Sequence, residues 1–259
     1  MILIISPAKT LDLSEETRYT ANYSLPSYQQ EAHELVRVLS GYSATQIKEL
    51  MGVSDNLAQL NYERYQKFQP EFNPENAKQA LLTFNGDVYT GFDLETYGEA
   101  DYRYAQEHLR ILSGLYGLLR PLDLIQPYRL EMGTRLKNEK GKDLYAFWGD
   151  QIARALNQAL EEAGTSTLVN LASNEYFKSV DTNALAGDII TPSFKDIRGG
   201  KPKVISFFAK KARGLMCDFA IKEKVSDPEE LKAFNGMGYE YNPELSSEKD
   251  WVFTREDNS

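Results

Sequence analysis

Charged side chains follow several apolar segments of this sequence. Lys9 comes shortly after the apolar run Ile2–Ile5, and Lys178 follows the apolar run Thr167–Leu171. The carboxyl ends of buried strands form the ligand crevice of α/β proteins, so both lysines are candidates for binding a phosphate or a carboxylate. The alternative for each of them is an ordinary lysine in solvent.

The densest group of cations lies between residues 195 and 213. Seven cations are opposed there by a single carboxylate, Asp196. They are Lys195, Arg198, Lys201, Lys203, Lys210, Lys211 and Arg213. We expect the last three to open a helix, where the helix dipole disfavours positive charge. A bound anion would relieve that cost, so this segment is a candidate phosphate site.

The stretch Leu112–Gly133 combines a glycine turn, two prolines and an arginine-rich flank. Its arginines, with the one just beyond it, are Arg120, Arg129 and Arg135. One interpretation is that the stretch binds a phosphate through its arginines. The other is that it forms a packed turn whose arginines lie in solvent. We expect the stretch to be mainly a scaffold for a cleft, with Arg129 as its best candidate for direct contact.

Polar residues also stand at two predicted strand ends. Asp87 and Tyr89 lie between two glycines in Phe84–Gly91, and Asn174 and Glu175 follow Thr167–Leu171. Asp87 could be a general base, a metal ligand or a turn residue whose side chain bonds nearby backbone. These four residues are candidates for the polar lining of the same cleft.

Residues 44–61 resemble a helix-hairpin-helix, an element whose turn amides face a nucleic-acid phosphate. Gly52, Val53 and Ser54 occupy the turn. Two positions depart from the usual pattern, because Ser54 replaces the second glycine and Met51 replaces a proline. The alternative is an ordinary turn between two helices.

Composition excludes several classes of function. The net charge of −9 argues against a generally basic nucleic-acid protein, although a local basic cleft is compatible with it. Two histidines and one cysteine disfavour a histidine-rich or cysteine-based metal site, so we expect no metal site, with a carboxylate-only Mg²⁺ site as the alternative. No nucleotide-cofactor fingerprint occurs. Cys217 follows a basic run and is either a peroxide sensor or a buried, inert thiol. Since no apolar run is long enough to span a bilayer, we expect a cytoplasmic protein.

The order of apolar segments predicts one α/β domain, residues 1–259, with a mixed β-sheet flanked by helices. The strands are expected at Ile2–Ile5, Ala80–Phe84, Thr167–Leu171, Ile189–Phe194, Val204–Phe208 and Trp251–Thr254. Helices are expected at 101–112 and, as one long helix, at 144–163.

Several segments taken together resemble the YaaA family of bacterial peroxide-stress-resistance proteins. They are Ile5–Thr10, Gly86–Gly91, Leu112–Gly133, Asn170–Val180 and Ile205–Met216, and the similarity extends to Gly238–Tyr241. No single segment is specific for the family, but the presence of all of them in this order is.

The resemblance implies a cytoplasmic protein of the hydrogen peroxide response that limits oxidative damage and keeps unincorporated iron low. It also implies one α/β domain, a basic cleft and a helix-hairpin-helix associated with DNA binding, and no established reaction. Gly52, Val53 and Ser54 match the hairpin of the family. The basic positions that recur in the family are matched in this sequence by Lys9, Arg129, Lys178, Lys210, Lys211 and Arg213.

Two functions follow as hypotheses. The first is DNA binding without sequence preference, through phosphate contacts. The second is an enzyme that acts on a phosphate-bearing or nucleobase-bearing substrate in the same cleft. Direct iron storage is disfavoured by the scarcity of ligands, so we expect any lowering of iron to be indirect.

Overall fold

The computed structural model describes residues 1–17 and 19–256. Its main helices are α1 (Gln29–Ser40), α2 (Ala44–Met51), α3 (Asp55–Lys67), α4 (Ala80–Thr83), α5 (Glu99–His108), α6 (Leu144–Trp148), α7 (Gln151–Glu162), α8 (Asn174–Phe177) and α9 (Ser206–Glu223). Its main strands are β1 (Ile2–Ile5), β5 (Leu109–Ser113), β6 (Gly117–Leu119), β8 (Thr167–Asn170), β9 (Asp188–Arg198), β10 (Lys201–Lys203), β11 (Glu240–Tyr241) and β12 (Asp250–Glu256). Short pairs join β2 (Thr10–Leu11) to β4 (Phe84–Asn85) and β3 (Lys78–Gln79) to β7 (Leu124–Ile125).

Within the described residues, eight strands form the main sheet in the order β11-β12-β9-β8-β1-β5-β6, with β10 paired to β9. The central pairs are parallel, and β5–β6, β9–β10 and β11–β12 are antiparallel. The predicted α/β class with a mixed sheet and flanking helices is therefore confirmed.

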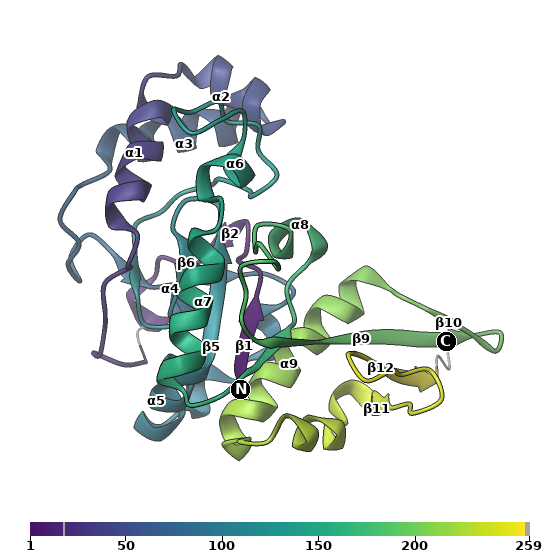
Figure 1. Cartoon of the computed structure of the whole chain (residues 1–259). Helices are drawn as coiled ribbons and strands as arrows, with labels where there is room; N and C mark the ends of the chain where they lie inside the picture. The colour runs from purple at the N-terminus through teal and green to yellow at the C-terminus, as the bar shows by residue number, and fades with distance from the viewer. Residues whose placement is uncertain (18, 257–259) are drawn as a thin grey trace.

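The centre of the sheet follows from the most apolar segments. All four residues of β1 are fully buried, and β1 pairs in parallel with β5 on one side and β8 on the other. A strand that is buried on both faces needs an unbroken apolar run, as Ile2–Ile5 provides. In Figure 1, α7 crosses in front of this region of the sheet and α9 lies behind it.

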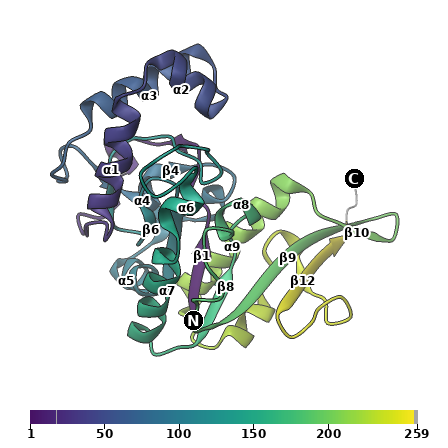
Figure 2. The same ribbon diagram turned by 45° about the horizontal axis from the view of Figure 1, so that its top comes forward.

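The long strand β9 carries the sheet beyond this core. Its residues 188–190 pair with β8, and its residues 191–197 pair with β12. The far half of β9, with β10, β11 and β12, projects to one side of the molecule, as Figures 1 and 2 both show. We call this part the arm.

Two of the predicted strands were wrong, and one predicted helix ends earlier than expected. Residues 204–208 were expected as a strand, but α9 begins at Ser206 and Val204 is 60% exposed. The expected strand Ala80–Phe84 is mostly the short helix α4, and the expected helix 101–112 ends at His108 and continues as β5.

The expected long helix at 144–163 is divided at Gly149. This residue has φ +50° and ψ −123°, a backbone conformation that favours glycine, and it separates α6 from α7. The predicted strands at Ile2–Ile5, Thr167–Leu171, Ile189–Phe194 and Trp251–Thr254 correspond to β1, β8, part of β9 and β12.

Candidate functional site

A pocket of about 450 Å³ opens at the carboxyl ends of β1 and β8. After β1, the next strand of the main sheet along the chain is β5, which lies on one side of the β1–β8 pair. After β8, the next strand is β9, which lies on the other side of that pair. The loops after these neighbouring strands therefore diverge, which is the arrangement that leaves a ligand crevice in α/β folds. We call this cavity the strand-end pocket.

Ser6, the first residue after β1, joins three walls of the strand-end pocket. Its carbonyl oxygen accepts a hydrogen bond of 3.1 Å from the Tyr89 hydroxyl. Its Oγ accepts the backbone N–H of Ser173 at 2.9 Å and donates to the Ser173 Oγ at 3.3 Å. These bonds fix the loop after β1 against the loop after β8.

Cations and carboxylates alternate around the strand-end pocket. Lys210 Nζ lies 3.2 Å from Asp87 Oδ2, and Lys9 Nζ lies 2.6 Å from Glu131 Oε2. A third carboxylate, Glu175, accepts the backbone N–H of Gly133 at 2.9 Å. The third cation is Arg213, so three positive and three negative side chains line the cavity. Such a lining suits a polar ligand that has both donors and acceptors.

Arg213 differs from the other two cations because it has no carboxylate within ion-pair distance among the described residues. Its Nε atom is buried and has no hydrogen-bond partner there. Burial lowers the pKa of its guanidinium from the usual value. A buried donor without a partner is costly, so an anion in the pocket would stabilise this side chain.

Two glycines bring the Asp87 wall against α9. A Cβ atom on Gly214 would lie 1.8 Å from the Val88 carbonyl oxygen. A Cβ atom on Gly91 would lie 2.4 Å from the backbone nitrogen of Leu215. The two backbones meet without side chains between them, and this contact sets the position of Asp87 relative to Lys210.

The structure brings together six of the residues singled out from the sequence. Lining the strand-end pocket are Lys9, Asp87, Tyr89, Glu175, Lys210 and Arg213. Arg129 lies behind this lining, with its Nη2 atom 3.1 Å from Glu131 Oε1. Glu131 thus connects Arg129 to Lys9.

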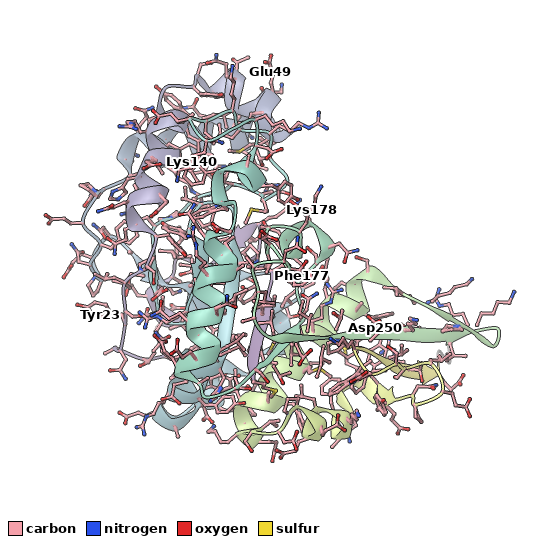
Figure 3. The ribbon with its side chains drawn as sticks, in the orientation of Figure 1. Tyr23, Glu49, Lys140, Phe177, Lys178 and Asp250 are labelled. Carbon is pink, nitrogen blue, oxygen red and sulfur yellow. The ribbon has the colours of Figure 1, made fainter. Side chains whose placement is uncertain are left out.

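Other predicted residues lie outside the strand-end pocket. Lys178 is exposed beside α8, with its Nζ 4.9 Å from the ring centre of Tyr145 (Figure 3). Lys211 and Asn174 do not line the cavity either, and Asn174 is the first residue of α8. Of the six recurrent basic positions, three therefore do not line this cavity, namely Arg129, Lys178 and Lys211.

Residues Gly52, Val53 and Ser54 form the turn between α2 and α3. This turn lies far from β1 and α9 in both Figure 1 and Figure 2. The N–H groups of Gly52 and Val53 both donate to the Lys48 carbonyl, at 2.9 and 3.3 Å. Asp55, at the start of α3, lies 2.8 Å from Lys48 Nζ. Since these two amides are engaged and a carboxylate stands beside them, the turn is poorly suited to a phosphate.

Sequence reasoning missed three groups of the strand-end pocket, namely Glu131, Ser6 and Ser173. Glu131 lies in the arginine-rich stretch, two residues after Arg129, and a carboxylate at that spacing could have indicated an ion pair. The two serines carried no such signal, because their roles depend on the pairing of β1 with β8.

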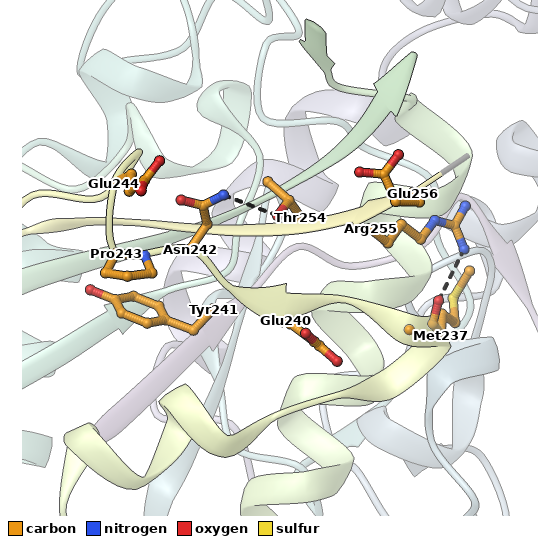
Figure 4. Close-up of a pocket in the computed structure, with 10 residues that line it drawn as sticks. Met237, Glu240, Tyr241, Asn242, Pro243, Glu244, Thr254, Arg255 and Glu256 are labelled. Carbon is orange, nitrogen blue, oxygen red and sulfur yellow. Dashed lines mark hydrogen bonds between the residues drawn. The ribbon is translucent and has the colours of Figure 1, made fainter. Parts of the chain in front are cut away.

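A larger and more open hollow of about 720 Å³ lies in the arm (Figure 4). Its charged lining is Glu240, Glu244, Glu256 and Arg255, and Arg255 is directed toward the carbonyl of Met237. No residue predicted as a site lines it. Among residues 1–17 and 19–256, no group of three or more histidine, cysteine, aspartate or glutamate side chains is placed to hold a metal ion.

The single cysteine, Cys217, is fully buried in α9. Burial raises the pKa of its thiol, and the neighbouring Asp218 raises it further. Because the thiolate is the reactive form, the interpretation as an inert thiol agrees with this environment.

We expect Cys217 of the folded chain to react with iodoacetamide roughly 100-fold more slowly than in denaturant, since both exposure and thiolate are lacking. Mass spectrometry of the alkylated protein over time measures this ratio. Equal rates in the folded and the denatured chain would show that the thiol is accessible.

No helix within the described part of the chain is long and apolar enough to cross a membrane. Comparison with protein-family models shows that residues 1–245 match the model described as peroxide stress protein YaaA. The match includes β1, β8 and α9, and hence every residue that lines the strand-end pocket.

Proposed function

We propose that this chain, which belongs to the peroxide stress protein YaaA family, is a cytoplasmic DNA-binding protein that limits iron-dependent oxidative damage. The observation that carries the proposal is the charge of residues 195–213. Seven cations stand there against one carboxylate. That carboxylate, Asp196, is buried and lies 2.6 Å from Arg255 Nε, a cation from outside this segment.

These cations extend from the arm to the mouth of the strand-end pocket. Lys201 and Lys203 are exposed on β10, and α9 then carries Lys210, Lys211 and Arg213. Lysines and arginines that neutralise phosphates release counterions from DNA, and this provides affinity without reading sequence. The proposal places DNA on residues 195–213 and the pocket mouth, in preference to the Gly52–Ser54 turn.

The test is charge reversal, in the triple variant Lys201→Glu/Lys203→Glu/Lys211→Glu. We expect at least about a tenfold loss of affinity for duplex DNA, and a salt slope of log K that is smaller by up to about 2.7, at about 0.9 per phosphate contact. Fluorescence anisotropy with a labelled duplex at several salt concentrations measures both quantities.

A matched control separates local charge from total charge. The variant Lys67→Glu/Lys137→Glu/Lys142→Glu changes the net charge by the same amount, from −9 to −15 (three lysines to three glutamates, −6), at exposed positions elsewhere. We expect it to keep most of the affinity. Equal losses in the two triple variants, or no dependence on salt in the unmodified chain, would contradict the proposal.

A second candidate function is an enzyme acting on a phosphate-bearing or nucleobase-bearing small molecule. The observation that favours it is the mixed lining of the strand-end pocket, where carboxylates could accept from a base or a sugar while Arg213 binds a phosphate. A volume of about 450 Å³ suits a single nucleotide and is too small for a duplex.

Thermal unfolding in the presence of nucleoside monophosphates tests this second function. We expect a rise in Tm that is lost in Arg213→Gln and kept in Arg37→Gln, whose side chain is 73% exposed. If no mononucleotide changes the Tm of the unmodified chain, the second function loses its support.

A further inference from the structure

A third pocket, of about 350 Å³, lies at the opposite end of the central sheet from the strand-end pocket. Arg110, the second residue of β5, forms part of its lining. Arg120, just after β6, and Arg154, on α7, also line it. Since β5 runs parallel to β1, the start of β5 is remote from the carboxyl ends where the strand-end pocket opens. We call this cavity the three-arginine pocket.

Arg110 is the unusual member of this group because it is only 5% exposed. Its Nη1 atom donates to the carbonyl oxygens of Gln106, Glu107 and Leu109, at 2.9, 3.3 and 2.9 Å. The first two carbonyls belong to the last turn of α5, so Nη1 caps that helix. These contacts satisfy donors of the side chain but supply no full negative charge.

The charge of Arg110 therefore has no direct counter-ion. No carboxylate of the described residues lies within ion-pair distance of it, whereas both rim arginines have one. Arg120 Nε lies 3.4 Å from Asp123 Oδ1, and Arg154 Nη2 lies 2.5 Å from Asp150 Oδ1. Burial, and next the charge of Arg120, lower the pKa of Arg110 to about 10. An unpaired buried cation is costly unless something supplies the opposite charge.

The remaining lining leaves space for such a charge. The lining itself has two carboxylates, Asp123 and Glu162, against three guanidinium groups, and Asp150, the partner of Arg154, lies outside the lining. Asp123 is already engaged, because its Oδ1 accepts from Ser24 at 2.6 Å and its Oδ2 accepts the Arg120 N–H at 2.8 Å. Gln158, also on the wall, donates from Nε2 to Glu162 Oε1 at 2.7 Å, so Glu162 is engaged as well.

We propose that the three-arginine pocket binds a small oxyanion carrying two or more negative charges, with Arg110 at its base and Arg120 and Arg154 at its rim. The planar fork of a guanidinium matches the oxygens of phosphate and carboxylate groups alike. One negative charge compensates Arg110, and further charges allow the rim arginines to turn from their own partners toward the ligand. This site is separate from the proposed DNA surface and from the strand-end pocket.

Isothermal titration of the full chain with inorganic pyrophosphate, at constant ionic strength, tests the proposal. We expect one binding site per chain, and a Kd weakened at least about tenfold in Arg120→Gln and in Arg154→Gln, as the loss of a charge-assisted hydrogen bond implies. Arg37→Gln, remote and exposed, should keep the affinity of the unmodified chain. The rim arginines are chosen because Arg110 also caps α5.

Further arms of the titration locate the site and identify the ligand chemistry. The variant Arg213→Gln should bind pyrophosphate with the Kd of the unmodified chain. If this variant no longer binds pyrophosphate, the anion lies in the strand-end pocket and the proposal is overturned. Citrate in place of pyrophosphate distinguishes a carboxylate ligand from a phosphate ligand, and binding of either one supports the site. The absence of saturable binding of both anions at millimolar concentration, or equal Kd values in the rim variants and the unmodified chain, overturns it.

Discussion

Replacing Asp196 with alanine is expected to destabilise the chain by about 3–5 kcal/mol, the usual cost of leaving a buried partner charge alone. Asp196 has no exposed surface, and it accepts from Arg255 Nε at 2.6 Å and from the Tyr239 hydroxyl at 2.8 Å. The guanidinium of Arg255 also lies 4.2 Å from the ring centre of Phe208, on α9. The ion pair therefore connects the arm to α9 as well as stabilising β9 against β12.

Urea denaturation of Asp196→Ala measures this loss. A control on the same strand is Asp188→Ala, because Asp188 pairs with Lys249 at 2.9 Å with both side chains largely exposed. We expect that control to cost less than about 1 kcal/mol. The double variant Asp196→Ala/Arg255→Met should recover part of the loss, since it removes the orphaned charge. If Asp188→Ala and Asp196→Ala lower the free energy of unfolding equally, burial of the Asp196–Arg255 pair contributes nothing to stability.

Replacing Gly214 with alanine is expected to destabilise the chain by about 1–3 kcal/mol, although alanine is the better helix former. The new methyl group would lie 1.8 Å from the Val88 carbonyl oxygen and 3.3 Å from Gly91 Cα. Both neighbours are backbone, so they cannot rotate away. The segment that holds Asp87 and Tyr89 must move off α9.

The matched control for this effect is Gly41→Ala. Gly41 has φ −78°, and a Cβ atom there would meet nothing closer than 3.4 Å. We expect this variant to change stability by less than about 0.5 kcal/mol, as surface substitutions usually do. Denaturation curves measure both variants. A Gly214→Ala chain as stable as the unmodified one would be incompatible with the backbone contact described here.

The parts of the fold that the sequence predicts well are those with a single physical cause. Ile2–Ile5 is an unbroken apolar run, and β1 is buried on both faces. Residues 204–208 are also apolar apart from Ser206, but Val204 and Phe207 are 60% and 54% exposed and the run opens a helix. Short apolar runs of this length do not distinguish strand from helix by periodicity, and only tertiary packing decides between them.

Some residues of the candidate site could likewise be predicted from the sequence, and others could not. Lys9, Asp87 and Glu175 could be predicted because each is a charged residue shortly after a strand. Lys9 and Glu175 follow β1 and β8 of the main sheet, and Asp87 follows β4 of the short β2–β4 pair. Lys178 satisfied the same criterion, yet α8 directs it to the surface, where it lies over Tyr145. The direction in which a side chain points after a strand depends on the conformation of the turn that follows the strand. The three-arginine pocket was beyond prediction, because it joins the start of β5 to α7 across the sheet.

The walls of the strand-end pocket come from residues 6–10, 85–89, 131, 173, 175, 176, 210 and 213. No short fragment of the chain contains them all, so the site exists only when segments between residues 6 and 213 are folded together. A ligand held there would bind the native state and have no site in the unfolded one. Its binding free energy would then be added to the global stability, by RT ln(1 + [L]/Kd). Resistance of the entire chain to proteolysis would thus report occupancy of the pocket, without any assay of catalysis or of DNA.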